Sequence, residues 1–206
     1  MNCVCIIPAR GGSTRIKDKN IRIFHGKPII AYSIETAKKS GIFDQIIVST
    51  DSENIATVAR HYGAEVMMRS ERLSQNDVGT QEVMAEVLKD IECDYACCLY
   101  ATAPLLSFPE LITALEYLRY AQSSYVVPIS TWLRDPGLFY FGRARAFKSG
   151  LELLCNTMFM RIHPSIDCDI NTEDDWLRAE QMYADLHVGE IQWCRQNTMG
   201  WRGVQG

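Results

Sequence analysis

The stretch that most constrains the fold is a loop of glycines and basic residues, residues 8–28, between an apolar run and a helix-like segment. Gly11 and Gly12 allow the backbone to turn sharply and to approach a ligand closely. Open α/β sheets bind ligands at such strand-to-helix junctions, so the loop favours a polyanion, most simply a nucleotide triphosphate. The alternative is a solvated basic loop without a ligand. Six side chains supply the positive charge, with Asp18 as the acidic residue among them: Arg10, Arg15, Lys17, Lys19, Arg22 and Lys27.

The loop does not follow either of two common phosphate-binding patterns. Gly11 and Gly12 are adjacent and no G-K-[ST] follows them, which excludes the G-x-x-x-x-G-K-[ST] loop. The G-x-G-x-x-G pattern is also missing, so a dinucleotide-binding fold is not expected.

Apolar runs and helix-like segments alternate along the first two thirds of the chain. This alternation predicts a mostly parallel sheet with helices on both faces and ligands beyond the carboxyl ends of its strands. Thr80 is expected to be the N-cap of its helix. The predicted strands are residues 3–7, 46–49, 65–68, 95–100 and 125–129, and the predicted helices are residues 28–40, 53–62, 81–91 and 109–120.

The last third is less regular. Short strands are predicted at residues 138–141, 157–161 and 166–170, followed by a closing helix over 172–186 that is capped by Thr172. We expect one domain over residues 1–190 and a polar tail over 191–206 that frays.

Composition narrows the function classes. The net charge of -4 does not indicate general nucleic-acid binding, and no apolar run approaches the ~20 residues that span a membrane. The N-terminus has no basic region before its short apolar run, so no export signal is expected. Eight cysteines show neither a C-x-x-C pair nor histidines spaced for zinc, which favours reduced thiols and a cytoplasmic location.

A longer motif within the loop narrows the fold further. The stretch P-A-R-G-G-S-x-R-I-x-x-K-N-I, followed by G-K-P-I-I-A-Y-S-I, resembles the signature of sugar-activating cytidylyltransferases. It is most similar to the nonulosonic acid branch, which includes CMP-sialic acid synthetases and pseudaminic acid cytidylyltransferases. The resemblance spans roughly residues 3–183 and implies a Rossmann-like three-layer α/β/α nucleotidyltransferase domain. It also implies transfer of CMP from CTP to an acidic sugar, with release of pyrophosphate.

The resemblance assigns roles in nucleotide binding. Arg10 and Lys19 match positions that contact the triphosphate, where fixed positive charge stabilises the leaving pyrophosphate. The base is expected near Arg69 and Thr80, because residues 69–80 resemble the family segment beside the cytosine; a helix cap alone is the alternative for Thr80. Thr14 stands where the family often has lysine, and Lys17 could substitute for it. The remaining predicted nucleotide contacts are Gly11, Gly12, Ser13, Arg15 and Asn20.

Two later motifs point to the sugar. Y-A-T-A-P at residues 100–104 follows the pseudaminic rather than the sialic form, and it places Thr102 toward the sugar or the ribose. G-L-F-Y-F-G-R at residues 137–143 also resembles the pseudaminic branch, which makes Phe139 and Tyr140 candidate sugar contacts. Packing in the core is the alternative for both aromatic residues.

The metal site departs from the family pattern. The family has D-I-D-T-x-x-D-W, whose first two aspartates hold Mg²⁺, whereas this chain has D-I-N-T-E-D-D-W at residues 169–176. Asp169 is kept and Asn171 replaces the second carboxylate, and a neutral amide oxygen is a weaker ligand for Mg²⁺. Asp167 would point to the same face as Asp169 on a strand. Our hypothesis is that Asp167 or a phosphate oxygen completes the shell.

The chain is also short where the family carries a sugar-binding and dimerisation segment. Only residues 130–136 fill that gap, with Arg134 as their cation. A homodimer is therefore left open. The rival to an enzyme is a non-catalytic nucleotide- or sugar-binding homologue, and within the enzymes the runner-up is synthesis of CMP-N-acetylneuraminate or another sugar nucleotide.

Overall fold

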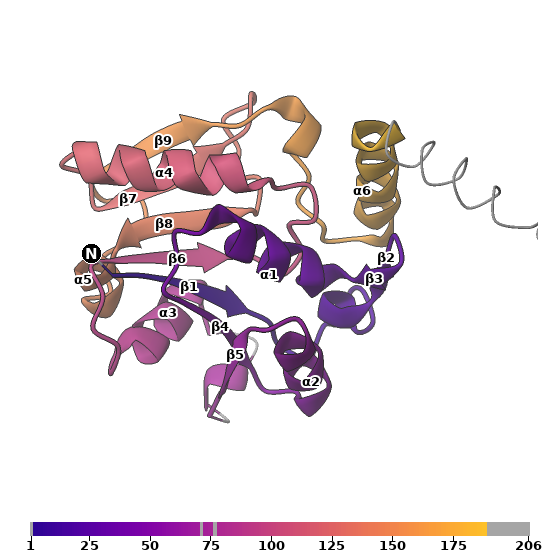
Figure 1. Cartoon of the computed structure of the whole chain (residues 1–206), viewed down its shortest axis with the longest axis horizontal. Coiled ribbons are helices and arrows are strands. Elements are labelled where there is room, and N and C mark those ends of the chain that lie inside the picture. Colours follow the sequence, from indigo (N-terminus) through magenta and orange to yellow (C-terminus); the bar gives the residue numbers. More distant parts are fainter. Residues whose placement is uncertain (1, 71, 76–77, 189–206) are drawn as a thin grey trace, which may run out of the picture.

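A seven-stranded sheet in the order β5-β4-β1-β6-β8-β7-β9 forms the centre of the computed structural model, which describes residues 2–70, 72–75 and 78–188 (Figure 1). Its pairs are parallel except those of β8, which runs antiparallel to both β6 and β7. This confirms the predicted α/β class with a mostly parallel sheet. The strands are β1 (Cys3–Pro8), β4 (Gln45–Thr50), β5 (Glu65–Met68), β6 (Tyr95–Leu99), β7 (Tyr125–Ile129), β8 (Phe139–Arg143) and β9 (Thr157–Arg161).

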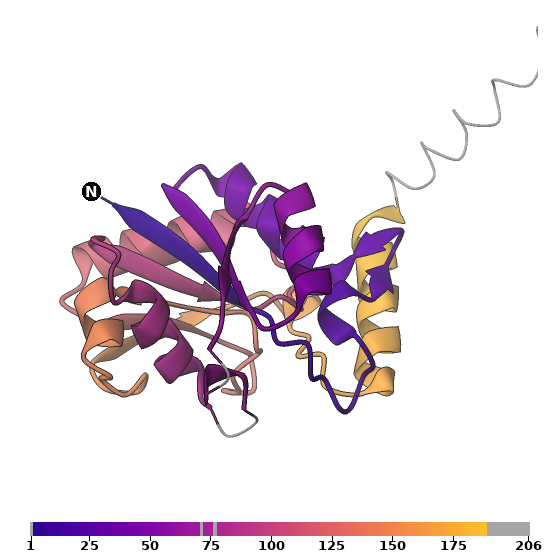
Figure 2. The ribbon, with the colours of Figure 1, turned by 90° about the horizontal axis from the view of Figure 1, so that it is seen from below.

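Helices cover both faces of this sheet (Figure 2). The central strand β1 is therefore buried on both sides. Cys3, Cys5 and Ile7 of β1 join the core with α1, α2 and α4, whereas Val4 and Ile6 pack with α3 and α5. A continuous apolar strand of this kind is typical of parallel sheets. The helices are α1 (Ile29–Ser40), α2 (Glu53–His61), α3 (Thr80–Leu88), α4 (Phe108–Tyr120), α5 (Ala144–Lys148) and α6 (Glu173–Leu186).

A small unit stands beyond the carboxyl ends of β1 and β6, where the strand arrows of Figure 1 point. It consists of α6 and a two-stranded hairpin, β2 (Ile23–Phe24) and β3 (Lys27–Pro28). Phe24 packs edge-on against Tyr32, Trp176 and Tyr183, with ring centroids 5.5 Å apart in each pair. This aromatic cluster holds α6 against the end of the cationic loop and the start of α1.

Local signals explain two of the helix ends. Gly41 adopts a left-handed conformation after α1, and Thr172 forms a capping box with Asp175 at the start of α6, as the predicted cap requires. Thr80 was predicted to be an N-cap, and this is wrong. Gly79 occupies the cap position, and Thr80 is the first residue of α3.

The predicted strand over residues 166–170 is also wrong. A 3-10 turn (Pro164–Ile166) occupies its start, and the following residues have no partner strand in the described part of the chain. Burial still alternates, since Ile166, Cys168 and Ile170 are buried. The apolar pattern thus reflects an extended segment lying on the core and not a sheet ladder. Two further 3-10 turns are Lys19–Ile21 and Arg72–Ser74.

The predicted tail, residues 191–206, and the domain boundary at residue 190 lie outside the described residues, so that division stays a prediction. Within the described ranges, no helix has both the length and the apolarity that crossing a bilayer requires.

Candidate functional site

The cationic loop is held against the start of α2. Gly11 donates its backbone N–H to Asp51 Oδ1 at 2.7 Å, and a Cβ at Gly11 would lie 2.9 Å from Ser52 Cβ. Glycine is therefore required at Gly11 by a close approach and not by a positive φ. A Cβ at Gly12 would have no atom within 4 Å, so no packing constraint of this kind acts there. Ile16 is fully buried and anchors the middle of the loop.

The loop closes on itself at its carboxyl end. Asn20 is 8% exposed and donates from Nδ2 to the Arg10 carbonyl oxygen at 2.9 Å. This contact fixes the backbone between the two predicted triphosphate-binding residues, Arg10 and Lys19. Asn20 thus stabilises the loop through a hydrogen bond to its backbone, which is the local role expected for an asparagine at a turn.

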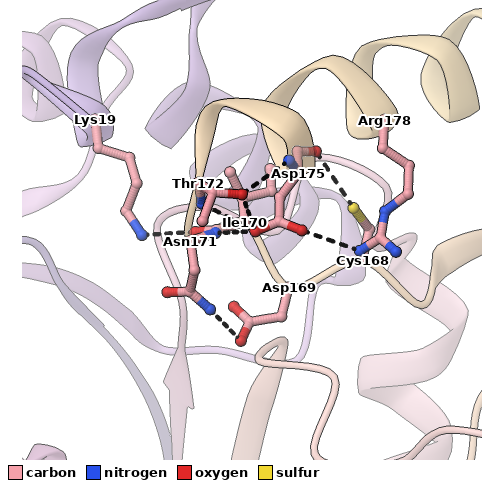
Figure 3. Close-up of polar contacts among 8 residues, drawn as sticks. All are labelled: Lys19, Cys168, Asp169, Ile170, Asn171, Thr172, Asp175 and Arg178. Atoms are coloured by element: carbon pink, nitrogen blue, oxygen red, sulfur yellow. Dashed lines mark hydrogen bonds and ion pairs between the residues drawn. The ribbon is translucent and has the colours of Figure 1, made fainter. Parts of the chain in front are cut away.

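The segment that carries Asp169 lies directly beside this loop, although about 150 residues separate the two in sequence (Figure 3). Lys19 Nζ donates to the Ile170 carbonyl oxygen at 2.7 Å, and Arg15 Nη2 donates to Asn171 Oδ1 at 2.9 Å. Burial lowers the pKa of the Lys19 ammonium, and the Asp169 carboxylate opposes that shift. The fold therefore brings the cationic loop and the segment that carries Asp169 together into one site.

Asp169 offers one carboxylate to a metal ion. Burial raises its pKa, while the Asn171 side chain, which donates to Oδ2 at 2.5 Å, and Lys19 lower it. Asn171 Oδ1 already accepts from Arg15, so the amide is a poor second ligand. Among the described residues, no three acidic, histidine or cysteine side chains gather around a common point. One carboxylate still suits Mg²⁺, which usually binds one or two carboxylates together with substrate phosphates and water.

A cavity of about 290 Å³ opens beyond the carboxyl ends of β1, β5 and β6. It brings six of the predicted residues together and adds others that the sequence did not suggest. A smaller cavity of about 80 Å³ adjoins it, shares Arg10, Lys19 and Asn20 with it, and adds Ser13, Arg15 and Asn171. The larger cavity is lined by Pro8, Arg10, Lys19, Asn20, Arg69, Gln75, Val78, Thr80, Val83, Tyr100, Ala101 and Thr102.

Arg69 lines the larger cavity and carries a buried donor without a partner among the described residues. Its Nε donates to Ser49 Oγ at 3.0 Å, but its Nη2 is buried and has no hydrogen-bond partner among the described residues. Burial lowers the pKa of the guanidinium, and Asp51 opposes that shift. A buried donor without a partner costs about 1–3 kcal/mol, which a ligand acceptor would recover.

Tyr100 connects the two sides of the site. Its hydroxyl lies 3.4 Å from Thr80 Oγ1 and 3.4 Å from the Tyr140 hydroxyl, which donates in turn to Asp135. Sequence reasoning singled out neither Tyr100 nor Asp135, although Tyr100 directly follows β6 and stands two residues before Thr102. Burial raises the pKa of Tyr100 to about 12, so the hydroxyl keeps its proton at neutral pH.

The sugar-side residues differ in how they reach the cavity. Thr102 is 6% exposed and lines it, whereas Tyr140 reaches it through Tyr100. Phe139 is fully buried in the core, as the packing alternative describes. Gly137 lies close to Asp169, because a Cβ there would be 2.7 Å from Asp169 Oδ1.

Known proteins are similar to this chain in sequence or in fold. The model of a family described as cytidylyltransferase matches residues 4–137. The pseudaminic acid cytidylyltransferase of Campylobacter jejuni subsp. jejuni is 32% identical over an alignment of 228 positions. The alignment covers 91% of this chain and 98% of that protein.

Two solved structures have a similar fold at low sequence identity. CMP:2-keto-3-deoxy-manno-octonic acid synthetase, complexed with CTP, has a TM-score of 0.73 and 16% identity and covers 90% of this chain and 99% of its own. Rv0371C of Mycobacterium tuberculosis, in complex with manganese, has a TM-score of 0.63 and 13% identity, with 88% and 99% covered.

The family match covers more than half of the chain, and the Campylobacter relative is similar over nearly its whole length. This chain therefore belongs to the cytidylyltransferase family.

Proposed function

We propose that this enzyme transfers CMP from CTP to an acidic nine-carbon sugar, pseudaminic acid or a close relative, and releases pyrophosphate. The observation that carries the proposal is the cavity at the carboxyl ends of the strands, which combines Arg10 and Lys19 with the unpartnered donor of Arg69. Positive charge at one end suits a triphosphate, and a buried donor at the other suits an acceptor on a base.

The nucleotide would lie along the two adjoining cavities. Arg10 and Lys19 would contact the triphosphate, with Ser13, Arg15 and the Gly11–Gly12 backbone around its outer phosphates. Arg69 and Thr80 would meet the cytosine. Asn20 would act indirectly, through the Arg10 carbonyl that it holds. The anomeric hydroxyl of the sugar would attack the α-phosphate in line, and catalysis would come mainly from positioning and electrostatics.

Asp169 would hold Mg²⁺ in this scheme, together with phosphate oxygens and water. When bound, the ion would neutralise negative charge on the phosphates. Asp167 is the candidate for a second carboxylate. Asn171 would instead orient Asp169, because it donates to that carboxylate and accepts from Arg15.

The sugar side supports pseudaminic acid over sialic acid through residues 100–104 and 137–143, which resemble the pseudaminic branch. Thr102 would face the sugar or the ribose, Tyr140 would border the sugar, and Phe139 would support it from the core. The relative from Campylobacter carries pseudaminic acid in its name, which supports the same choice. CMP-N-acetylneuraminate synthesis is the alternative within this class.

A second candidate function is nucleotide or sugar binding without catalysis. One observation favours it: the amide of Asn171 occupies the place of the second metal-binding carboxylate and is already hydrogen-bonded to Arg15 and Asp169.

Pyrophosphate release from CTP with a panel of sugar acids separates these candidates. Turnover with pseudaminic acid supports the main proposal. Turnover with N-acetylneuraminic acid but not with pseudaminic acid supports the alternative. CTP binding by calorimetry without any turnover supports the binding homologue. Sedimentation of the same sample reports a homodimer as a doubled mass. The seven cysteines of the described residues are free thiols, which supports the cytoplasmic location that we also propose.

A further inference from the structure

A chain of hydroxyl groups runs from the cavity wall to a carboxylate outside the cavity. It begins at Thr80 and Tyr100, which line the cavity, passes through Tyr140 and ends at Asp135. Asp135 lies in an exposed loop and takes no part in lining the cavity. The scheme proposed above gives Asp135 and Tyr100 no role.

The carboxylate sets the direction of the chain. An ionised aspartate only accepts hydrogen bonds, and Asp135 accepts from the Gly137 N–H at 2.8 Å and from the Tyr140 hydroxyl. Tyr140 has a single hydroxyl proton, so its oxygen is left as an acceptor. Donation to a carboxylate makes that oxygen a stronger acceptor, and Tyr100 donates to it.

The same reasoning carries the direction to the cavity. The proton of Tyr100 is engaged with Tyr140, so the Tyr100 oxygen accepts and Thr80 is the donor in the contact between them. The Thr80 oxygen then has only lone pairs left for a ligand. Burial raises the pKa values of both tyrosines, so neither loses the proton on which this direction depends.

We infer that Asp135 is a positioning residue for base recognition, which fixes Thr80 as a hydrogen-bond acceptor and so favours cytosine over uracil. Arg69 presents a donor on the same cavity wall. Cytosine offers a 4-amino donor beside the acceptors N3 and O2, which complements an acceptor and a donor. Uracil has a 4-carbonyl acceptor in place of the amino donor, which would oppose the Thr80 oxygen. It keeps the O2 acceptor but has N3–H in place of the N3 acceptor, which would oppose a donor at that position. This inference rests on the proposed function and adds the source of its base specificity.

The test is the ratio of the dissociation constants for UTP and CTP, measured by calorimetry on the full chain without sugar. We expect Asp135→Ala, Tyr140→Phe and Tyr100→Phe each to reduce this ratio about tenfold, since each removes the group that orients the next hydroxyl. Asp135→Ala changes an exposed loop residue and is expected to fold normally. Tyr125→Phe is the matched control, because it removes another hydroxyl, which donates to the Leu151 carbonyl at 2.6 Å and not to the cavity, and it should leave the ratio unchanged.

Each result decides the matter. A reduced ratio in all three variants supports the inference. An unchanged ratio, equal weakening of both nucleotides, or an effect confined to Tyr100→Phe overturns the role of Asp135. If the unmodified chain binds CTP tightly and selectively while the variants keep that selectivity, the inference fails alone. If the unmodified chain binds neither nucleotide, the proposed function fails.

Discussion

The predicted nucleotide side and the predicted sugar side of the site are built differently. We call them the nucleotide side and the sugar side. The nucleotide side follows regular parallel strands, and its loop is held by the Asn20 contact within the loop and by Asp51 just before α2. The sugar side consists of the residues around β8 and of the extended segment before α6, and these contact each other at Gly137 and Asp169. The loop of the predicted nucleotide side thus combines a contact of its own with contacts to Asp51 and to the segment before α6. The predicted sugar side is instead assembled where the residues around β8 meet that segment.

Removing positive charge from the nucleotide side should have the largest effect, and that effect is on CTP binding. We expect Arg10→Ala combined with Lys19→Ala to weaken CTP binding by at least about 100-fold, since each charge-assisted contact contributes roughly 1.5–3 kcal/mol. Calorimetry with CTP measures the loss. Lys89→Ala combined with Arg119→Ala carries the same charge change at exposed positions that do not line the cavity and should bind CTP normally. Unchanged affinity in the first double variant would contradict the whole assignment of the loop.

The second test addresses the contact between the two sides. We expect Asp169→Asn to slow turnover by about 100-fold, because an ion held there supplies several kcal/mol of charge stabilisation. Mn²⁺ binding in the presence of CTP, followed by electron paramagnetic resonance, should weaken in parallel. Asp174→Asn, in the exposed first turn of α6, is the control. Comparing Asp167→Ala in the same titration shows whether that carboxylate belongs to the shell: an unchanged Mn²⁺ affinity excludes it.

The sequence predicts these two sides unequally, for physical reasons. Continuous apolar runs and glycine stops mark β1, α1 and β5, so their positions agree with the structure within one or two residues. The pattern of residues 138–141 does not encode strand direction, so the antiparallel insertion of β8 between β6 and β7 could not be predicted. The hairpin of β2 and β3 has strands of two residues, too short for any periodicity.

The candidate site shows the same division. Arg10, Lys19, Arg69 and Thr102 meet at one cavity because parallel strands end at a common edge, which the sequence makes predictable. The hydroxyl chain through Tyr100 and Asp135 arises only when a helix, a strand and a loop are brought together. No spacing in the sequence marks it.

The two loop glycines test how the nucleotide loop is held. We expect Gly11→Ala to lower the free energy of unfolding by about 1–3 kcal/mol, because its Cβ would collide with Ser52 at the start of α2. Gly12→Ala is the matched control and should change stability by less than about 0.5 kcal/mol, since its Cβ meets open space. Urea unfolding compares the two variants. Equal effects would show that the loop is not held against α2 in the way described.

The smallest expected effect tests the predicted sugar side. Ser130 is fully buried, and its Oγ accepts from the backbone N–H groups of Trp132 at 3.2 Å and Arg134 at 3.1 Å. Ser130→Ala leaves those two donors without that partner and should loosen the short segment over residues 130–136, at about 1 kcal/mol.

If that segment shapes the sugar pocket, the KM for the sugar acid should rise about fivefold. The dissociation constant for CTP should rise by less, because the segment reaches the nucleotide side only indirectly, through Asp135 and Tyr140. Ser70→Ala is a suitable control, since its side chain lies in an exposed loop on the nucleotide side. An equal rise in both constants would contradict a role of the segment on the sugar side in particular. The nucleotide loop is hydrogen-bonded to Asp51, just before α2, and to the segment before α6. Ser130 belongs to neither of these anchors, and its segment meets the cavity wall through the hydroxyl chain that ends at Asp135. The KM for the sugar acid should therefore respond more strongly than CTP binding.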